Sequence, residues 1–313
     1  MSSAINRIQI GNICVDPCNY ESAIARILKL ASDDRPHLVV TPNIAHVYQS
    51  RSSHVLRRAY RQASFAPPDG WPVVEAARML GDHSVLVERV AGSDLMIDLC
   101  MQSVSIAIVG GAGDSAEEAA RRLSRQNPKL QVLSVEPAPR SEISDTDAMG
   151  RLVDRIAAAG PDLVFVGLGV PRQEAIALEL LGRLDRGVVI CVGASIEFAA
   201  GTLKRAPKFL QRLKLEWLYR LVREPRKLAV RYLMSAPYFL ATIITQYRRS
   251  GRSTPVDKTR TSDIRPPHSI DRLIVHQFDP ARPSPGGIDT CLRGLCKYFP
   301  AGQPIAIVGV DTG

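Results

Sequence analysis

The sequence predicts an α/β fold, with a Rossmann-like, mostly parallel sheet and flanking helices, followed by a basic helical appendage. Two observations support this prediction. Short apolar runs alternate with helical patterns through the first 200 residues, which is typical of parallel strands joined by helical crossovers. Residues 200–252 carry thirteen Lys and Arg against two Glu, a local +11 in a chain of net charge +9. With 313 residues and 45% hydrophobic content, the chain can bury one or two cores.

The apolar runs define the expected sheet. Each is short, rich in β-branched residues and followed by loop residues, as in a buried strand. The expected strands are 7–10, 37–41, 104–109, 131–135, 162–166 and 188–192. Apolar residues spaced three and four apart predict helices between them, at 20–31, 54–62, 71–80, 94–101, 116–125, 148–159 and 174–184.

The loops that follow the expected strands are the first place to look for a site, because ligands of such sheets gather at the carboxyl ends of the strands. These loops are rich in glycine and short polar residues. They contain Thr41 to Asn43, Pro68 to Gly70, Gly110 to Gly113, residues 167–174 and Gly193 to Ser195.

Four segments are expected along the chain. Residues 1–200 form a catalytic α/β domain, residues 201–248 the basic appendage, and residues 249–269 a linker rich in Ser, Thr, Pro and Arg. Residues 270–313 repeat a strand, helix and strand pattern at 273–276, 288–298 and 305–310, which is an incomplete βαβ unit. A piece of this size does not bury an adequate core by itself.

The basic appendage contains an uncharged run, residues 232–247, that is interrupted by Pro237. It is shorter than the roughly 20 apolar residues needed to cross a bilayer. Cations beside apolar side chains favour a segment that lies on an anionic membrane surface. The alternatives are an amphipathic helix packed on its own domain and a nucleic-acid patch. No RNA-binding or DNA-binding motif accompanies the charges, so no nucleic-acid partner is expected.

Cysteine usage and the N-terminus indicate the compartment. The six cysteines form no CxxC pair and no cluster with zinc spacing, which favours reduced thiols. The first ten residues lack the apolar stretch of a signal peptide. We therefore expect a cytoplasmic protein, associated peripherally with the inner face of the cell membrane.

One motif supports a different function. Gly111, Gly113 and Ala116 satisfy GxGxxA after an expected strand, and Glu136 closes the next strand. In a dinucleotide site the glycines admit a phosphate at a helix N-terminus and the acid binds a ribose hydroxyl. The alternative function is therefore an NAD-dependent oxidoreductase. A tight turn that binds no ligand explains the glycines equally well, and a third class, a non-catalytic membrane adaptor, would bind neither nucleotide.

Five ordered motifs are more specific than this fingerprint. They are TPNIAH at 41–46, PDG at 68–70, ERVAGSD at 88–94, GLGVPRQE at 167–174, and RAP at 205–207 with LEWLYR at 215–220. Together they resemble the WecG/TagA/CpsF family of bacterial glycosyltransferases, over roughly residues 5–248. The piece at 270–313 resembles the start of a second, two-Rossmann-domain glycosyltransferase, or is a truncated frame without its own function.

The resemblance implies an inverting, metal-independent transfer of a sugar from a UDP-sugar to a polyprenyl-diphosphate-linked glycan, in cell-surface or exopolysaccharide synthesis. The sugar could be N-acetylmannosamine, its uronic acid or glucose. By resemblance, Asp69 is the catalytic base and Arg89 belongs to the catalytic arginine position. A homo-oligomer is compatible with the sequence, and neither a metal nor a cofactor is expected.

The resemblance also implies the substrate-binding residues. Thr41, Asn43 and Gln173 line the pocket, and the basic stripe of Arg220, Arg223, Lys227 and Arg231 faces the diphosphates of donor or acceptor. The glycine loop at Gly111 and Gly113 is a candidate phosphate site. The chain's DxD sequence, Asp145 to Asp147, precedes an expected helix and is interpreted as a helix N-cap and not as a metal ligand.

Overall fold

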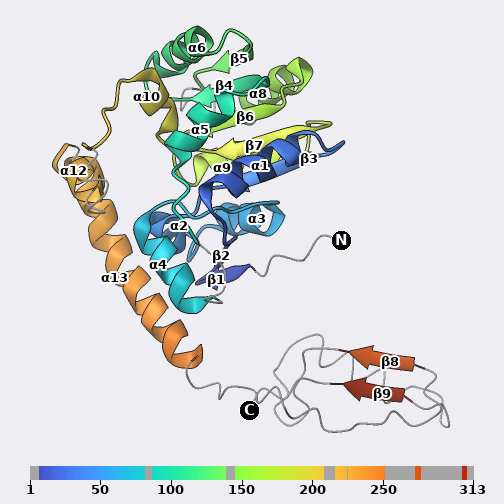
Figure 1. Ribbon diagram of the computed structural model, residues 1–313, viewed down its shortest axis with the longest axis vertical. Coiled ribbons are helices and arrows are strands. Elements are labelled where there is room, and N and C mark those ends of the chain that lie inside the picture. The colour runs from blue at the N-terminus through green and yellow to red at the C-terminus, as the bar shows by residue number, and fades with distance from the viewer. Residues whose placement is uncertain are drawn as a thin grey trace. The chain divides into compact units, whose positions relative to one another are not determined.

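A five-stranded, wholly parallel sheet forms the centre of the protein in a computed structural model (Figure 1). The structure describes residues 7–81, 87–138, 145–207, 216–223, 225–250, 272–275 and 305–308. The strand order is β3-β7-β6-β4-β5. The strands are β3 (Pro36–Val40), β4 (Ser105–Gly110), β5 (Gln131–Glu136), β6 (Leu163–Gly167) and β7 (Gly187–Cys191). The fold class and these five expected strands are confirmed.

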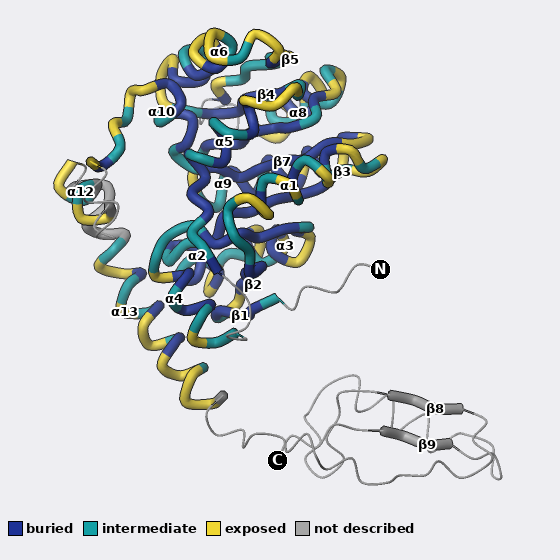
Figure 2. The backbone as a smooth tube through the Cα atoms, viewed as in Figure 1, coloured by how far each residue is buried: buried dark blue, intermediate teal, exposed yellow. Residues whose placement is uncertain are grey.

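Helices cover both faces of this sheet. One face packs against α1 (Tyr20–Ala31), α5 (Gly92–Cys100), α6 (Ser115–Gln126) and α10 (Ser195–Ala200). The other packs against α3 (His54–Gln62), α4 (Trp71–Leu80), α8 (Thr146–Ala159) and α9 (Arg172–Leu181). Strands β6 and β7 are buried along their whole length, because side chains of each strand alternate between the two layers. Figure 2 shows this buried centre under an exposed outer surface.

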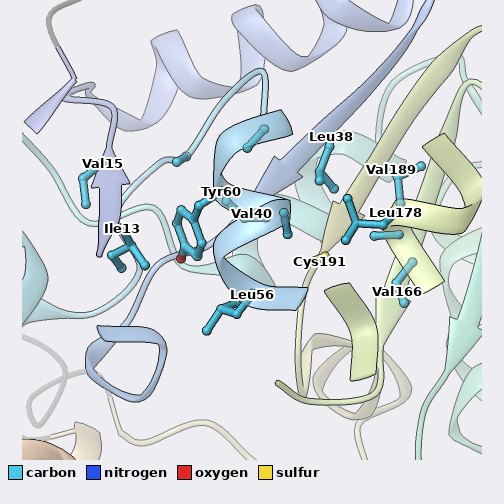
Figure 3. Packing of buried hydrophobic residues seen from close by; sticks show 14 of the residues in the cluster. Ile13, Val15, Leu38, Val40, Leu56, Tyr60, Val166, Leu178, Val189 and Cys191 are labelled. Carbon is cyan, nitrogen blue, oxygen red and sulfur yellow. The ribbon is translucent and has the colours of Figure 1, made fainter. Parts of the chain in front are cut away.

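The first expected strand does not join the parallel sheet. Strand β1 (Ile8–Ile10) pairs antiparallel with β2 (Ile13–Val15), which the sequence analysis did not predict. The two strands are separated by Gly11 and Asn12, whose short turn closes a hairpin. Ile10, Ile13 and Val15 are fully buried, so the hairpin contributes its apolar face to the core beside α3 (Figure 3).

The hairpin is held to the sheet by a buried carboxylate. Asp16 follows β2 and is 1% exposed. It accepts a 2.7 Å hydrogen bond from the backbone N–H of Ala66 and lies 3.2 Å and 3.7 Å from guanidinium nitrogens of Arg7 and Arg26. Next to this pair, Phe65 bridges Val39 of β3 in parallel. Residues 64–66 therefore extend the edge of the sheet beyond β3.

The basic appendage forms two helices, α12 (Glu216–Arg223) and α13 (Pro225–Ser250). Pro225 begins α13, as expected for a proline that cannot continue a helix. Ser235, Phe239 and Ile243 of α13 are buried and lie four residues apart, on one helical face. Gln246 accepts a 3.0 Å hydrogen bond from the backbone N–H of Gly11 in the hairpin. Residues 1–247 accordingly form one compact unit.

The membrane-spanning potential of the helices is low: among the described residues, no helix is both long enough and apolar enough to cross a bilayer. The seven expected helices are all present, and the additional short helices are α2 (Ile44–Gln49) and α10.

Residues 248–313 form a second unit. In it β8 (Arg272–Val275) pairs in parallel with β9 (Ile305–Val308), so the two expected strands of a βαβ unit are present. The expected helix at 288–298 and the linker at 249–269 lie outside the described residues, apart from the last turn of α13.

Candidate functional site

The candidate base, Asp69, lies at the carboxyl edge of the parallel sheet. Its backbone N–H donates a 2.9 Å hydrogen bond to the carbonyl of Pro42, in the loop that follows β3. Its side chain is 28% exposed. Asp69 is therefore held beside a strand end, where sheets of this kind bind their ligands, and its carboxylate remains accessible.

Local sequence explains this position. The chain leaves the edge of the sheet at Ala66 and turns through two prolines before Asp69. Gly70 then adopts φ of +102°, which is unfavourable for a residue with a side chain, and serves as the N-cap of α4. Pro72, in the first turn of α4, has no N–H to leave unpaired. The result is a fixed turn that presents Asp69 immediately before a helix.

Arg89 is brought to the same place by a separate segment. The backbone N–H of Val90 donates a 2.8 Å hydrogen bond to the carbonyl of Pro68. This bond places Arg89 Nε 4.0 Å from Asp69 Oδ1, with the arginine side chain 20% exposed.

The two carboxylates nearest to Arg89 in sequence are engaged elsewhere. Glu88 accepts a 3.0 Å hydrogen bond from the N–H of Tyr20, at the start of α1. Asp94 pairs with Arg205 at 2.6 Å. A salt bridge of Arg89 to Glu88 or Asp94, which would have given Arg89 a purely structural role, is therefore not what the structure contains.

Thr41 and Asn43 follow β3 directly. The Thr41 hydroxyl is buried and donates a 2.9 Å hydrogen bond to the carbonyl of Cys191, the last residue of the neighbouring β7. Asn43 is the N-cap of α2, and its side-chain oxygen accepts a 3.0 Å hydrogen bond from Ala45 N–H. Both residues are near Asp69, but their described hydrogen bonds organise the edge of the sheet.

Gln173 is more deeply buried than a pocket-lining residue needs to be, with 2% exposure. Its Oε1 accepts a 3.0 Å hydrogen bond from Gly193 N–H, in the loop after β7. Its Nε2 donates a 2.8 Å hydrogen bond to Glu174 Oε1. Gln173 thus supports the loop that follows β7 from beneath.

The sequence analysis missed a buried polar cluster beside these residues. Glu174, His46 and Tyr60 are 0%, 1% and 2% exposed. His46 Nδ1 lies 2.7 Å from the Tyr60 hydroxyl, and His46 Nε2 lies 3.9 Å from Glu174 Oε1. In Figure 3 Tyr60 lies among the apolar side chains of the core, with Ile13 and Val40 on either side.

Burial dominates the electrostatics of this cluster. Loss of solvation disfavours the charged carboxylate and raises the pKa of Glu174 from 4.5 to about 7. Burial, followed by the charges of Glu174 and neighbouring groups including Asp69, raises the pKa of Tyr60 well above 10. One signal was available in the sequence: two adjacent polar residues, Gln173 and Glu174, after a strand, with His46 after another.

The glycine loop after β4 is explained by packing. Gly111 has φ of +90°, and a Cβ there would lie 2.9 Å from Ile196 of α10. Gly113 has φ of +56° and no neighbour within 4 Å of such a Cβ. Glu117 and Glu118 occupy the first turn of α6, where a bound phosphate would be repelled.

The acid of the dinucleotide fingerprint is also engaged. Glu136 pairs with Arg155 at 2.8 Å. These contacts disfavour the redox alternative at Gly111, and they give Gly111 a structural reason that does not involve a ligand.

The basic stripe is divided between two helices. Arg220 and Arg223 belong to α12, and Lys227 and Arg231 belong to α13. The side chains of Arg220, Lys227 and Arg231 lie outside what the structure describes. Arg223 is exposed, with its guanidinium carbon 5.4 Å from the centre of the Tyr219 ring. The role of the stripe remains a prediction.

The DxD sequence behaves as expected for a helix start. Asp145 is the N-cap of α8 and accepts hydrogen bonds from Asp147 N–H and Ala148 N–H. The bond from Ala148, followed by the bond from Asp147, lowers the pKa of Asp145. Among the residues that the structure describes, no group of three or more His, Cys, Asp and Glu side chains has the geometry of a metal site.

Comparison with known proteins agrees with this geometry. The chain matches the model of the glycosyl transferase WecG/TagA/CpsF family over residues 8–253. It is similar to proteins named N-acetylglucosaminyldiphosphoundecaprenol N-acetyl-beta-D-mannosaminyltransferase. The Bacillus spizizenii protein is 28% identical over 68% of this chain and 81% of its own length. The Staphylococcus aureus (strain MW2) protein is 28% identical over 67% of this chain and 81% of its own length. We conclude that the chain belongs to the WecG/TagA/CpsF family of glycosyl transferases.

Proposed function

We propose that this protein transfers an N-acetylhexosamine, in the first instance N-acetylmannosamine, from a UDP-sugar to a polyprenyl-diphosphate-linked N-acetylglucosamine. The observation that carries the proposal is the pair of Asp69 and Arg89, 4.0 Å apart at the carboxyl edge of the sheet. A base and a cation side by side are what a sugar transfer from a diphosphate donor requires.

The proposed step is a single displacement. The acceptor hydroxyl oxygen attacks C1 of the donor sugar as its proton passes to Asp69, which acts as the general base. The bond between C1 and the diphosphate oxygen breaks, and UDP leaves with the electron pair. Inversion at C1 follows from attack opposite the leaving group, and the relatives' names specify a β-linked product.

Arg89 is the proposed partner of the departing diphosphate. A guanidinium offers several N–H donors in one plane and binds phosphate oxygens in pairs. Fixed donors of this kind stabilise the charge that develops on the leaving group without a metal ion. The stripe of Arg220, Arg223, Lys227 and Arg231 is proposed to supply further cations to the diphosphates of donor or acceptor.

The exposed surface of α13 supports peripheral attachment to a membrane. Leu233, Leu240 and Ile244 are 74%, 59% and 49% exposed, and spacings of seven and four place them on one stripe. This stripe is not the face that α13 buries on the domain. Arg248 and Arg249 follow it. Exposed apolar side chains beside cations suit an anionic lipid surface, which is where a polyprenyl-linked acceptor resides. We therefore place the protein at the inner face of the cytoplasmic membrane.

A donor screen tests the proposed function. Purified protein is incubated with a soluble polyprenyl-diphosphate N-acetylglucosamine analogue and, separately, UDP-N-acetylmannosamine, its uronic acid, and UDP-glucose. We expect transfer from UDP-N-acetylmannosamine in the presence of a chelator. Calorimetric titration with UDP and with NADH provides the control, because the redox alternative predicts NADH binding and a membrane adaptor predicts binding of neither. Binding of NADH without UDP would overturn the proposal.

A further inference from the structure

Glu174 is a buried carboxyl group that the proposed chemistry does not use. It lies in the first turn of α9, is 0% exposed, and is covered by the core cluster around α3 and β7. One carboxyl oxygen, Oε1, accepts the hydrogen bond from Gln173. The other, Oε2, is buried without a hydrogen-bond partner among the described residues. Burying a carboxyl group in this way is costly, so a specific role is needed to explain it.

The bond from Gln173 to Glu174 determines how the Gln173 amide is oriented. A carboxyl oxygen accepts a hydrogen bond, so it faces Nε2 and leaves Oε1 of Gln173 to face the opposite way. Oε1 there accepts the N–H of Gly193, which has φ of +59°. With no acceptor at Glu174, the amide could turn by half a rotation and present NH₂ to the Gly193 N–H, which would break that bond.

Gly193 is connected to the candidate base by a short path through the sheet edge. It stands two residues after Cys191, whose carbonyl accepts the Thr41 hydroxyl. The next residue after Thr41 is Pro42, whose carbonyl accepts the Asp69 N–H. The loops after β7 and β3 are therefore joined by side-chain and backbone bonds that begin at Glu174 and end at Asp69.

His46 and Tyr60 hold Glu174 from the opposite side. His46 Nε2 lies 3.9 Å from Glu174 Oε1, and His46 Nδ1 contacts the Tyr60 hydroxyl at 2.7 Å. The rings of His46 and Tyr60 meet edge to face with centroids 5.9 Å apart. This packing restricts Glu174 to the conformation in which Oε1 faces Gln173.

We infer that Glu174 is a positioning residue for the transfer reaction: it orients Gln173, which fixes the Gly193 loop at the substrate-binding edge of the sheet. The inference rests on the proposed function only in assigning that edge to the donor. Glu174 acts as a hydrogen-bond acceptor, and an uncharged acceptor of the same shape meets the same need.

The test compares Glu174→Gln with Glu174→Leu. Glutamine retains an acceptor oxygen, whereas leucine has similar volume and no acceptor. Hydrogen exchange of peptides that contain the Gly193 amide is measured first, because this readout does not depend on catalysis. We expect at least tenfold faster exchange at Gly193 in Glu174→Leu and exchange within threefold of wild type in Glu174→Gln. Glu179→Leu, at an exposed position of the same helix, is the matched control.

The kinetic readout follows on the same proteins. We expect Glu174→Leu to raise KM for the UDP-sugar at least tenfold and Glu174→Gln to restore it. Gln173→Leu should reproduce the effect, and the double variant should be no worse than either single variant, since the two residues act in series. If Glu174→Leu does not fold, Gln173→Leu decides the question alone with Glu174 intact.

The outcomes separate the two proposals. Unchanged Gly193 exchange and unchanged KM in a folded Glu174→Leu variant would overturn the inference, and so would a Glu174→Gln variant as impaired as Glu174→Leu. If wild type neither binds UDP nor transfers sugar, the proposed function fails, while the exchange measurement still decides whether Glu174 positions the loop.

Discussion

Arg89 Nε lies 4.0 Å from Asp69 Oδ1, although the two residues come from different segments and are joined through the hydrogen bond of Val90 to Pro68. Replacing Arg89 therefore tests the diphosphate half of the mechanism. We expect Arg89→Met to reduce kcat/KM for the UDP-sugar about 100-fold, which corresponds to about 3 kcal/mol. Arg89→Lys should recover only part of this, because an ammonium group does not form paired bonds to phosphate. Steady-state kinetics measure the effect.

The matched control is Arg183→Met, which removes a surface arginine paired with Asp154. Its kinetics should equal those of wild type. Equal losses in the two variants would show that Arg89 has no special role.

The exposed stripe of α13 predicts lipid binding. In Leu240→Ser with Ile244→Ser, two exposed apolar side chains are lost, and we expect binding to anionic vesicles to fall at least about tenfold, since burial of each such side chain contributes roughly 1.5 kcal/mol or more. Vesicle cosedimentation measures binding. The control pair, Met79→Ser with Leu133→Ser, removes side chains that are 48% and 43% exposed on other elements. If both pairs weaken binding equally, α13 is not the attachment surface.

Asp16 predicts a large effect on stability. Asp16→Ala would leave Ala66 N–H without its buried acceptor and remove the partner of Arg7 and Arg26. We expect the free energy of unfolding to fall by about 3 kcal/mol, measured by urea denaturation. Asp154→Ala, at an exposed pair with Arg183, should change it by less than about 1 kcal/mol. Similar values for the two variants would contradict the structural role of Asp16.

Glu174 predicts a pH dependence of stability. Its pKa is raised from 4.5 to about 7, so the native state binds its proton more tightly than the unfolded chain does. The contribution is complete below pH 4.5 and is lost as pH rises through 7, by about 2 kcal/mol between pH 5 and 8. His46, Tyr60 and Cys191 face or lie near this carboxyl group.

Glu174→Gln removes this titration. The variant should lose about 2 kcal/mol less unfolding free energy than wild type between pH 5 and 8, as measured by urea denaturation at both values. Parallel losses in the two proteins would show that Glu174 does not titrate in this range.

The sheet could be predicted from the sequence because its strands are buried on both faces. Residues 163–167 and 187–191 read as unbroken apolar runs, and each ends in glycine or a polar loop. The hairpin strand at 13–15 could not, because three residues carry too little periodicity, and its antiparallel partner looks like any other short apolar run. Its place in the core depends on Asp16 and Ala66, which are distant in sequence.

The candidate site was predictable in part for a similar reason. Asp69 and Arg89 stand in distinctive motifs, and the parallel topology brings strand-following loops to one edge. The burial of Gln173 and the cluster of His46, Tyr60 and Glu174 were not predictable, since they depend on how α2, α3 and α9 pack. A histidine eight residues from another one gives no indication of a tyrosine partner in a different helix.

Turnover by Asp69→Asn is the measurement that tests the central claim most directly. Asparagine keeps the shape of the side chain but does not accept the acceptor's proton. We predict a fall in kcat of at least about 100-fold, with the affinity for UDP measured by calorimetry unchanged. Asp114→Asn, at an exposed aspartate before α6, should turn over like wild type. Wild-type turnover by Asp69→Asn would show that this carboxylate is not the base.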